Sequence, residues 1–218
     1  MRDREVDHVL RILQSTSKEW ALPAVSRVGE ETRDPFLVLT SCLLSLRTKD
    51  QVTEEASNRL FARARTPLQL LTLPQKTIQR LIYPVAFYRI KSKRIHQICH
   101  HLMGRFQGKV PSTLEDLLTL PGVGRKTANL VLTVGFQKLG ICVDTHVHRI
   151  SNRIGYVKTK TPEKTEMALR GKLPKKYWIR YNDLLVAFGQ QICRPVSPLC
   201  SRCPIERYCP RVDVRYSR

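Results

Sequence analysis

The sequence predicts an all-α protein, and three observations lead to this fold class. Apolar residues recur at helical spacing, as in the N-terminal series Val6, Val9, Leu10 and Leu13. No alternating apolar and polar run is long enough for a β-sheet, and we find no internal repeat. A glycine-rich turn at 120–124 separates two helical patterns. With 218 residues, the chain suits one large or two small domains with an adequate core.

Helix-start residues and apolar spacing place the remaining elements in order, about ten helices in all. We expect helices at 36–46 and 49–62, two short ones opened by Thr66-Pro67 and Pro74, and then helices at 90–106, 144–154, 162–173 and 177–192. In the helix at 90–106, the predicted inward residues are Ile95, Ile98 and Leu102, and the predicted outward residues are Lys91, Lys93 and Arg94.

The turn at 120–124 predicts a helix-hairpin-helix. Ser112 and Glu115 have the spacing of a capping box for a short helix, with Leu114, Leu117 and Leu118 on its apolar side. Pro121 ends that helix, and Gly122 and Gly124 allow a sharp reversal before a second helix near Arg125. Such a turn presents backbone N–H groups and a helix N-terminus, which suit a phosphate. A plain structural turn is the alternative.

Lys126 lies in the first turn of the second helix, beside Arg125. The positive end of the helix dipole, the neighbouring guanidinium and an expected partial burial all disfavour a charge on its amine. A neutral lysine amine is a nucleophile. In a chain this basic, a solvated lysine that contacts a phosphate is the competing interpretation.

The helix after Lys126 is apolar almost all round and should be a buried central helix. From Lys126 to Lys138 it would rise about 18 Å, and the five residues Gly140 to Asp144 could return about 16 Å if extended. Asp144 can therefore lie near Lys126. A simple N-cap on a helix that begins at Thr145 is the alternative role, and the two roles are compatible.

Charge and cysteine content narrow the function classes. The chain has 38 Lys and Arg against 18 Asp and Glu, a net charge of +20, which indicates a nucleic-acid partner. An anionic membrane surface is the alternative, but no amphipathic stretch with a basic face supports it. We expect no membrane-spanning helix and no signal peptide, hence a cytoplasmic, nucleoid-associated protein, or a nuclear one if the source has a nucleus.

Four of the seven cysteines form a C-terminal cluster that indicates a metal centre. Cys193, Cys200, Cys203 and Cys209 have the spacing C-x6-C-x2-C-x5-C. Four thiolates can hold zinc or an iron–sulfur cluster. With only one close pair, the spacing favours iron–sulfur, and zinc remains open. The other three, Cys42, Cys99 and Cys142, should be core residues.

Together, the hairpin LPGVGRKTAN, the VDTHVHR segment and the four C-terminal cysteines resemble the endonuclease III family of helix-hairpin-helix DNA glycosylases, over nearly the whole chain. The resemblance implies a six-helix barrel at 28–138, with the hairpin at about 113–138, and a domain of 1–27 plus 139–218 that holds a 4Fe-4S cluster. It implies a monomeric DNA glycosylase and AP lyase of base excision repair. Such an enzyme acts on double-stranded DNA, removing oxidised pyrimidines and nicking abasic sites.

The resemblance also assigns residue roles. Lys126 would be the catalytic nucleophile, and Asp144 would assist it. The segment at 43–50 departs from the family, because Arg47 stands where a glutamine usually fills the gap left by a flipped base; Arg47 could do the same or simply contact phosphate. Phe87 matches a second gap-filling position, with a core phenylalanine as the alternative. The further DNA contacts would be Gly122, Val123, Gly124, Arg125, Thr127, His146 and Arg194.

Two other functions remain open at this stage. A mismatch glycosylase of the same fold would act on thymine or uracil opposite guanine, or on adenine, but such relatives typically lack a lysine at position 126. A DNA-binding scaffold would keep the hairpin and the charge without turnover. Arginines near the cysteines, Arg194, Arg202, Arg207 and Arg211, could contact the DNA backbone or be solvated.

Overall fold

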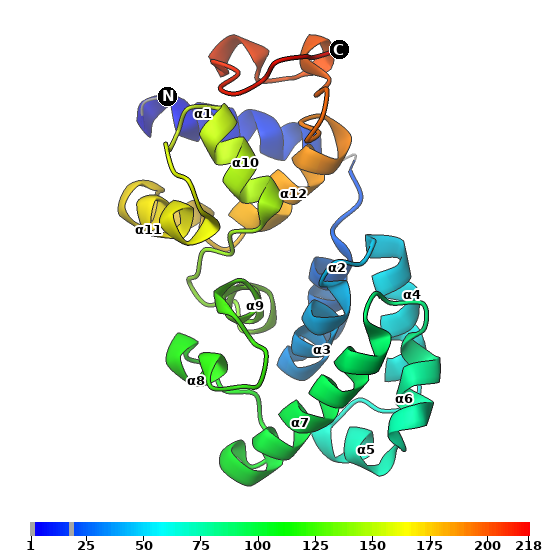
Figure 1. Cartoon of the computed structure of the whole chain (residues 1–218). Coiled ribbons are helices and arrows are strands. Elements are labelled where there is room, and N and C mark those ends of the chain that lie inside the picture. Colours follow the sequence, from blue (N-terminus) through cyan, green and yellow to red (C-terminus); the bar gives the residue numbers. More distant parts are fainter. Residues whose placement is uncertain (1–2, 18–19) are drawn as a thin grey trace. The chain divides into compact units, whose positions relative to one another are not determined.

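A computed structural model describes residues 3–17 and 20–218, and these residues form helices joined by turns, with no β-strand (Figure 1). They divide into two compact units. One consists of Met1–Leu22 and Ile141–Arg218, and the other of Pro23–Gly140. The all-α prediction is confirmed. Among the helices in the described ranges, none combines the length and the apolar character that a bilayer crossing requires.

The unit Pro23–Gly140 is built around one strongly apolar and almost completely buried helix, α3 (Pro35–Ser45). The unit contains α2 (Ala24–Thr32), α3, α4 (Asp50–Phe61), α5 (Pro67–Thr72), α6 (Gln75–Ile82), α7 (Tyr88–Phe106), α8 (Leu114–Leu118) and α9 (Arg125–Leu130). Asp34 caps α3 by accepting the Phe36 N–H at 2.8 Å, and Pro35 occupies its first turn. Every residue from Phe36 to Leu44 is buried, because α3 packs against α2, α4, α7 and α9 (Figure 1).

The helix that begins at Arg125 is shorter than predicted. It ends in a π-helical turn, Val131–Gly135, instead of continuing to Lys138. Close packing accompanies this turn: a Cβ added to Gly29 of α2 would lie 2.2 Å from Cγ1 of Val134. The helix is nonetheless buried, as expected, from Thr127 to Val134.

The second unit joins the two ends of the chain. It contains α1 (Asp3–Thr16), α10 (Thr145–Arg153), α11 (Pro162–Lys172) and α12 (Tyr181–Gln191). In this unit α12 packs against α1 and α10, and α10 packs against α11 (Figure 1). The Tyr177 hydroxyl donates to Asp7 at 2.8 Å, and Lys176 forms an ion pair with the same carboxylate. The helix predicted at 177–192 begins only at Tyr181, after a 3₁₀ turn at Lys175–Tyr177.

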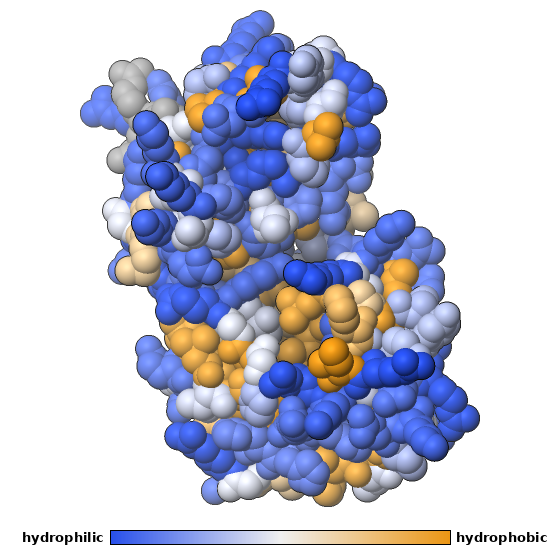
Figure 2. Space-filling view, viewed as in Figure 1, coloured by the Kyte–Doolittle hydropathy of each residue, from blue (hydrophilic) through white to orange (hydrophobic). Residues whose placement is uncertain are grey.

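The surface is mostly hydrophilic, as the charge of +20 leads one to expect. Figure 2 shows hydrophilic residues over most of the visible face, with apolar residues gathered on the unit Pro23–Gly140 around α3, α8 and α9. The three cysteines predicted to be core residues, Cys42, Cys99 and Cys142, are buried.

Candidate functional site

The hairpin is present, and its first helix starts one residue later than predicted. Thr113, not Ser112, is the N-cap, and its hydroxyl accepts the Asp116 N–H at 3.2 Å and donates to the Asp116 carboxylate at 2.8 Å. The reciprocal pair is therefore Thr113 and Asp116, and Glu115 is not part of it. The shift leaves Leu117 buried and turns Leu118 outward, with 37% of it exposed.

The turn itself exposes two glycines around a buried valine. Gly122 has a φ of +73°, the left-handed region that favours glycine. A Cβ on Gly122 would lie 2.8 Å from Nε of Arg94, so α7 also packs closely against the turn. Val123 is buried and its N–H donates to the Leu120 carbonyl at 3.1 Å, which anchors the turn and leaves the backbone of Gly122 and Gly124 at the surface.

Lys126 follows directly in the first turn of α9, and its side chain is exposed. The prediction of partial burial is wrong, because only the residues from Thr127 onward face the interior. The lysine nevertheless influences the core: burial raises the pKa of the Cys42 thiol to about 12, and the positive charge of Lys126 acts in the opposite direction. The amine is thus accessible to a ligand and lies close enough to α3 to act on a buried thiol. Thr127 is buried, the least accessible of the predicted DNA contacts in this turn.

Asp144 is the N-cap of α10. Its Oδ1 accepts the N–H groups of His146 at 2.8 Å and Val147 at 2.9 Å. The structural role considered from the sequence is therefore real. His146, half-buried, lies with Nδ1 3.1 Å from Nη2 of Arg149. Since Asp144 and Lys126 belong to different units, their pairing remains a prediction.

Arg47 and Phe87 lie together within the unit Pro23–Gly140, although they are 40 residues apart in the sequence (87 − 47). The Arg47 guanidinium carbon is 5.9 Å from the centroid of the Phe87 ring, a cation–π distance. Phe87 is 55% exposed, so its alternative role as a core residue is wrong. Both residues have positive φ values, +54° and +57°. Their contact makes one exposed cationic and aromatic tip.

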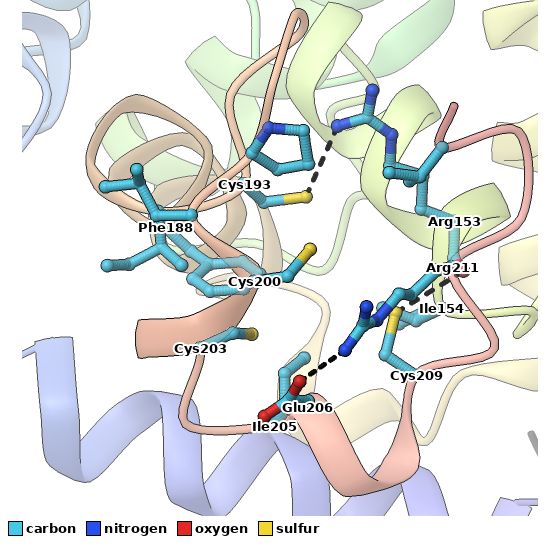
Figure 3. Close-up of a pocket in the computed structure, with 14 residues that line it drawn as sticks. Arg153, Ile154, Phe188, Cys193, Cys200, Cys203, Ile205, Glu206, Cys209 and Arg211 are labelled. Atoms are coloured by element: carbon cyan, nitrogen blue, oxygen red, sulfur yellow. Dashed lines mark hydrogen bonds and ion pairs between the residues drawn. The ribbon is translucent and has the colours of Figure 1, made fainter. Parts of the chain in front are cut away.

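The four C-terminal cysteines line one cavity, which Figure 3 shows with the sulfur atoms turned inward. The cavity has about 390 Å³ of empty space, part of it open to solvent, and Phe188, Ile154 and Ile205 form part of its wall. Burial raises the pKa of Cys203 to about 12, and negative charge on the other three cysteines acts in the same direction. Four thiolates therefore need compensating positive charge, which a metal centre supplies.

The donor set of this cavity is four thiols (Figure 3). A polynuclear centre bound by thiolates fits four inward thiols around one cavity.

Two arginines of α10 hold the segment that begins at Cys193, and sequence reasoning missed both. Arg149 donates to the Cys193 carbonyl at 2.8 Å. Arg153 donates to the carbonyls of Arg194 and Pro195, both at 2.6 Å, and to the Cys193 sulfur at 3.6 Å. The Arg194 side chain is exposed. The i, i+4 spacing of the two arginines on one helix face was a usable signal.

The comparisons with known proteins now identify the family. Residues 40–175 match the HhH-GPD superfamily of base excision DNA repair proteins. Endonuclease III of Thermotoga maritima is 51% identical over 176 residues, which cover 81% of this chain and 83% of that protein. Endonuclease III-like protein 1 of Mus musculus is 48% identical over 178 residues, 80% of this chain and 59% of that protein.

A solved structure of a trapped endonuclease III–DNA covalent intermediate has a TM-score of 0.86 and 30% identity, with 97% of each chain covered. The chain therefore belongs to the HhH-GPD superfamily of base excision DNA repair proteins and, within it, to the endonuclease III family.

Proposed function

We infer that this chain is a bifunctional DNA glycosylase and AP lyase of base excision repair. The observation that carries the inference is a lysine, Lys126, placed directly after an exposed glycine hairpin in the endonuclease III fold. We propose double-stranded DNA with oxidised pyrimidines or abasic sites as the substrate, a monomer as the active form, and action in the nucleoid or, if the source has one, the nucleus.

The proposed chemistry uses the Lys126 amine as nucleophile. A damaged nucleotide is first turned out of the duplex, at a cost that is lowest for a poorly paired base. The amine then bonds to the sugar C1′ as the bond from C1′ to the base breaks, and the base leaves with a proton. Opening of the sugar ring gives a Schiff base. Loss of a proton from C2′ then expels the 3′ phosphate and nicks the strand.

The domains predicted from the sequence would divide these tasks. We propose that the barrel at 28–138 supplies Lys126, the hairpin and the tip formed by Arg47 and Phe87. The domain of 1–27 plus 139–218 would supply Asp144, which would stabilise the positive charge that develops on the sugar and accept a proton from the amine. The turn residues Gly122 to Arg125, with Thr127, His146 and Arg194, would bind phosphates near the lesion.

We propose that the cysteine cavity holds a 4Fe-4S cluster through Cys193, Cys200, Cys203 and Cys209. Four inward thiols around one cavity, with only one closely spaced pair in C-x6-C-x2-C-x5-C, support a cluster over zinc. When bound, the cluster would supply a rigid structural support and need not transfer electrons. Arg153 and Arg149 hold the backbone of the same segment, so this support would fix the exposed Arg194 at the surface.

Borohydride trapping tests the assignment of Lys126. Reduction of the Schiff base with abasic DNA should give a covalent protein–DNA adduct, and Lys126→Ala should abolish the adduct while duplex affinity changes little. Lys109→Ala, which removes another exposed lysine of the same unit, is the matched control and should trap normally. An adduct that persists in Lys126→Ala would contradict the assignment.

The rival activity is that of a mismatch glycosylase, which would use activated water. It predicts base release opposite guanine without any trapped adduct. Base release from a duplex with thymine or uracil opposite guanine, measured beside trapping on abasic DNA, therefore separates the two activities.

A further inference from the structure

The ammonium group of Lys91 is buried, contrary to the outward position that helical spacing predicts. Lys91 lies in α7 and is 8% exposed. Its Nζ donates to the carbonyls of Leu44 at 2.8 Å and Leu46 at 2.6 Å, and to the Thr48 hydroxyl at 3.2 Å. An ammonium has three N–H donors, so these three oxygens satisfy it completely. Periodicity failed here because the C-terminal end of α3 offers carbonyl acceptors to a cation.

Two of these contacts are made by the residues on either side of Arg47. The Leu46 carbonyl precedes it, and the Thr48 hydroxyl follows it. Arg47 itself has a φ of +54°, a conformation that costs a non-glycine residue about 1 kcal/mol or more and persists only when its surroundings enforce it. The Lys91 ammonium joins the two residues that flank this turn, so it enforces the conformation of Arg47.

The turn of Phe87 is linked to the same place. Phe87 is the N-cap residue of α7, and its carbonyl accepts the backbone N–H of Lys91 at 2.9 Å, an ordinary helical hydrogen bond. Thr48 forms a second connection, since its hydroxyl oxygen accepts the Ala86 N–H at 3.3 Å. The turn that carries Arg47 and the turn that carries Phe87 are therefore tied together through Lys91 and Thr48, beneath the contact of the guanidinium with the ring at 5.9 Å.

We propose that Lys91 is a positioning residue that holds Arg47 against Phe87, so that the pair fills the gap left by an extruded nucleotide and contacts the base left unpaired opposite it. This inference rests on the proposed function of Arg47 and Phe87. Preorganisation is the physical reason: an arginine already held in its turn loses less side-chain entropy on binding. A guanidinium carries only donors, so it binds acceptor atoms on the unpaired base.

A double-mutant cycle tests the proposal. The probe is a duplex with a tetrahydrofuran abasic analogue, compared with the same duplex undamaged, at one stated salt concentration. We expect Lys91→Met, which keeps the side-chain length but removes the charge, to lower the preference for the gapped duplex about tenfold, the scale of one lost arginine–base contact. In an Arg47→Ala background, Lys91→Met should cost nothing further, because it acts through Arg47.

The matched control is Lys93→Met, which removes the same charge from an exposed position of α7 and should leave the preference unchanged. Thr48→Val removes the hydroxyl that binds both the Lys91 ammonium and the Ala86 N–H, and it should also lower the preference for the gapped duplex. It replaces Lys91→Met if that variant does not fold. If the losses of preference caused by Lys91→Met and Arg47→Ala simply add in the double variant, the proposal is overturned and Lys91 is a structural residue. The proposal is also overturned if neither Arg47→Ala nor Lys91→Met changes the preference for the gapped duplex.

Failure of this inference differs from failure of the catalytic assignment. The cycle measures binding to an analogue that cannot form a Schiff base, whereas trapping at Lys126 measures covalent chemistry. A chain that traps abasic DNA normally but shows additive binding costs refutes only the role of Lys91.

Discussion

Substitution of Asp144 separates its observed role as a helix cap from its proposed role in catalysis, because asparagine keeps the cap and removes the carboxylate. Oδ1 accepts two N–H groups at the start of α10, at 2.8 and 2.9 Å, and asparagine caps helices about as well as aspartate. Asp144→Asn should therefore lower the free energy of unfolding by only about 0.5 kcal/mol, the value of a negative charge at a helix N-terminus. Asp144→Ala also removes the cap and should cost about 1 to 2 kcal/mol.

The catalytic effect should be far larger than the stability effect. A lost proton acceptor typically slows a reaction about 10²- to 10⁴-fold, which is a barrier increase of about 3 to 5 kcal/mol. Single-turnover release of an oxidised pyrimidine from duplex DNA measures the rate, and urea unfolding of the same variants measures stability. If Asp144→Asn releases the base at the wild-type rate, or if the rate falls only in Asp144→Ala in step with stability, Asp144 is a helix cap and nothing more.

Three further predictions concern stability and the metal centre. Burial lowers the pKa of Lys91 from 10.5 to about 8, so between these values the folded chain binds fewer protons than the unfolded chain, and the free energy of unfolding should rise with pH by up to about 3 kcal/mol. Urea titrations from pH 7.5 to 10.5 should show this rise relative to Lys91→Met; parallel curves would contradict it. Gly29→Ala would place a Cβ 2.2 Å from Val134 and should destabilise by about 1 to 3 kcal/mol. Gly104→Ala, whose new Cβ would meet no atom within 4 Å apart from its chain neighbours and the backbone of its own helix, should stabilise α7 by about 0.5 to 1 kcal/mol; equal effects on the unfolding midpoint would refute the packing argument. The purified protein should be brown and contain iron and inorganic sulfide, and Cys203→Ser should lower both; zinc without sulfide would rule out the cluster.

Local signals predicted most helices to within two residues. The helix expected at 36–46 is α3, Pro35–Ser45, and the one expected at 162–173 is α11, Pro162–Lys172. Proline at the first turn and an N-cap before it are strong local determinants, so they can be recognised without tertiary information.

The sequence-based predictions were wrong where contacts with a distant segment determine the burial or the contacts of a side chain. Lys91 is buried because the end of α3 supplies acceptors 43 to 47 residues away, and no periodic pattern contains that information. Lys126 was expected to be partly buried because the rest of its helix is apolar, but the orientation of a first-turn side chain depends on how the hairpin turns. The contact between Arg47 and Phe87 likewise follows from two turns meeting in space.

Helix α10 connects Asp144, the proposed catalytic carboxylate, with the segment that carries the four cysteines. It begins at Asp144 and ends at Arg153, which binds the backbone of the cysteine segment. Its nine residues span only about 14 Å. A displacement of the cysteine segment can therefore be transmitted through this short helix to the carboxylate of Asp144. Removal of the proposed cluster should therefore loosen Asp144 and slow base release even when DNA still binds, and faster amide hydrogen exchange along α10 would report that loss of rigidity.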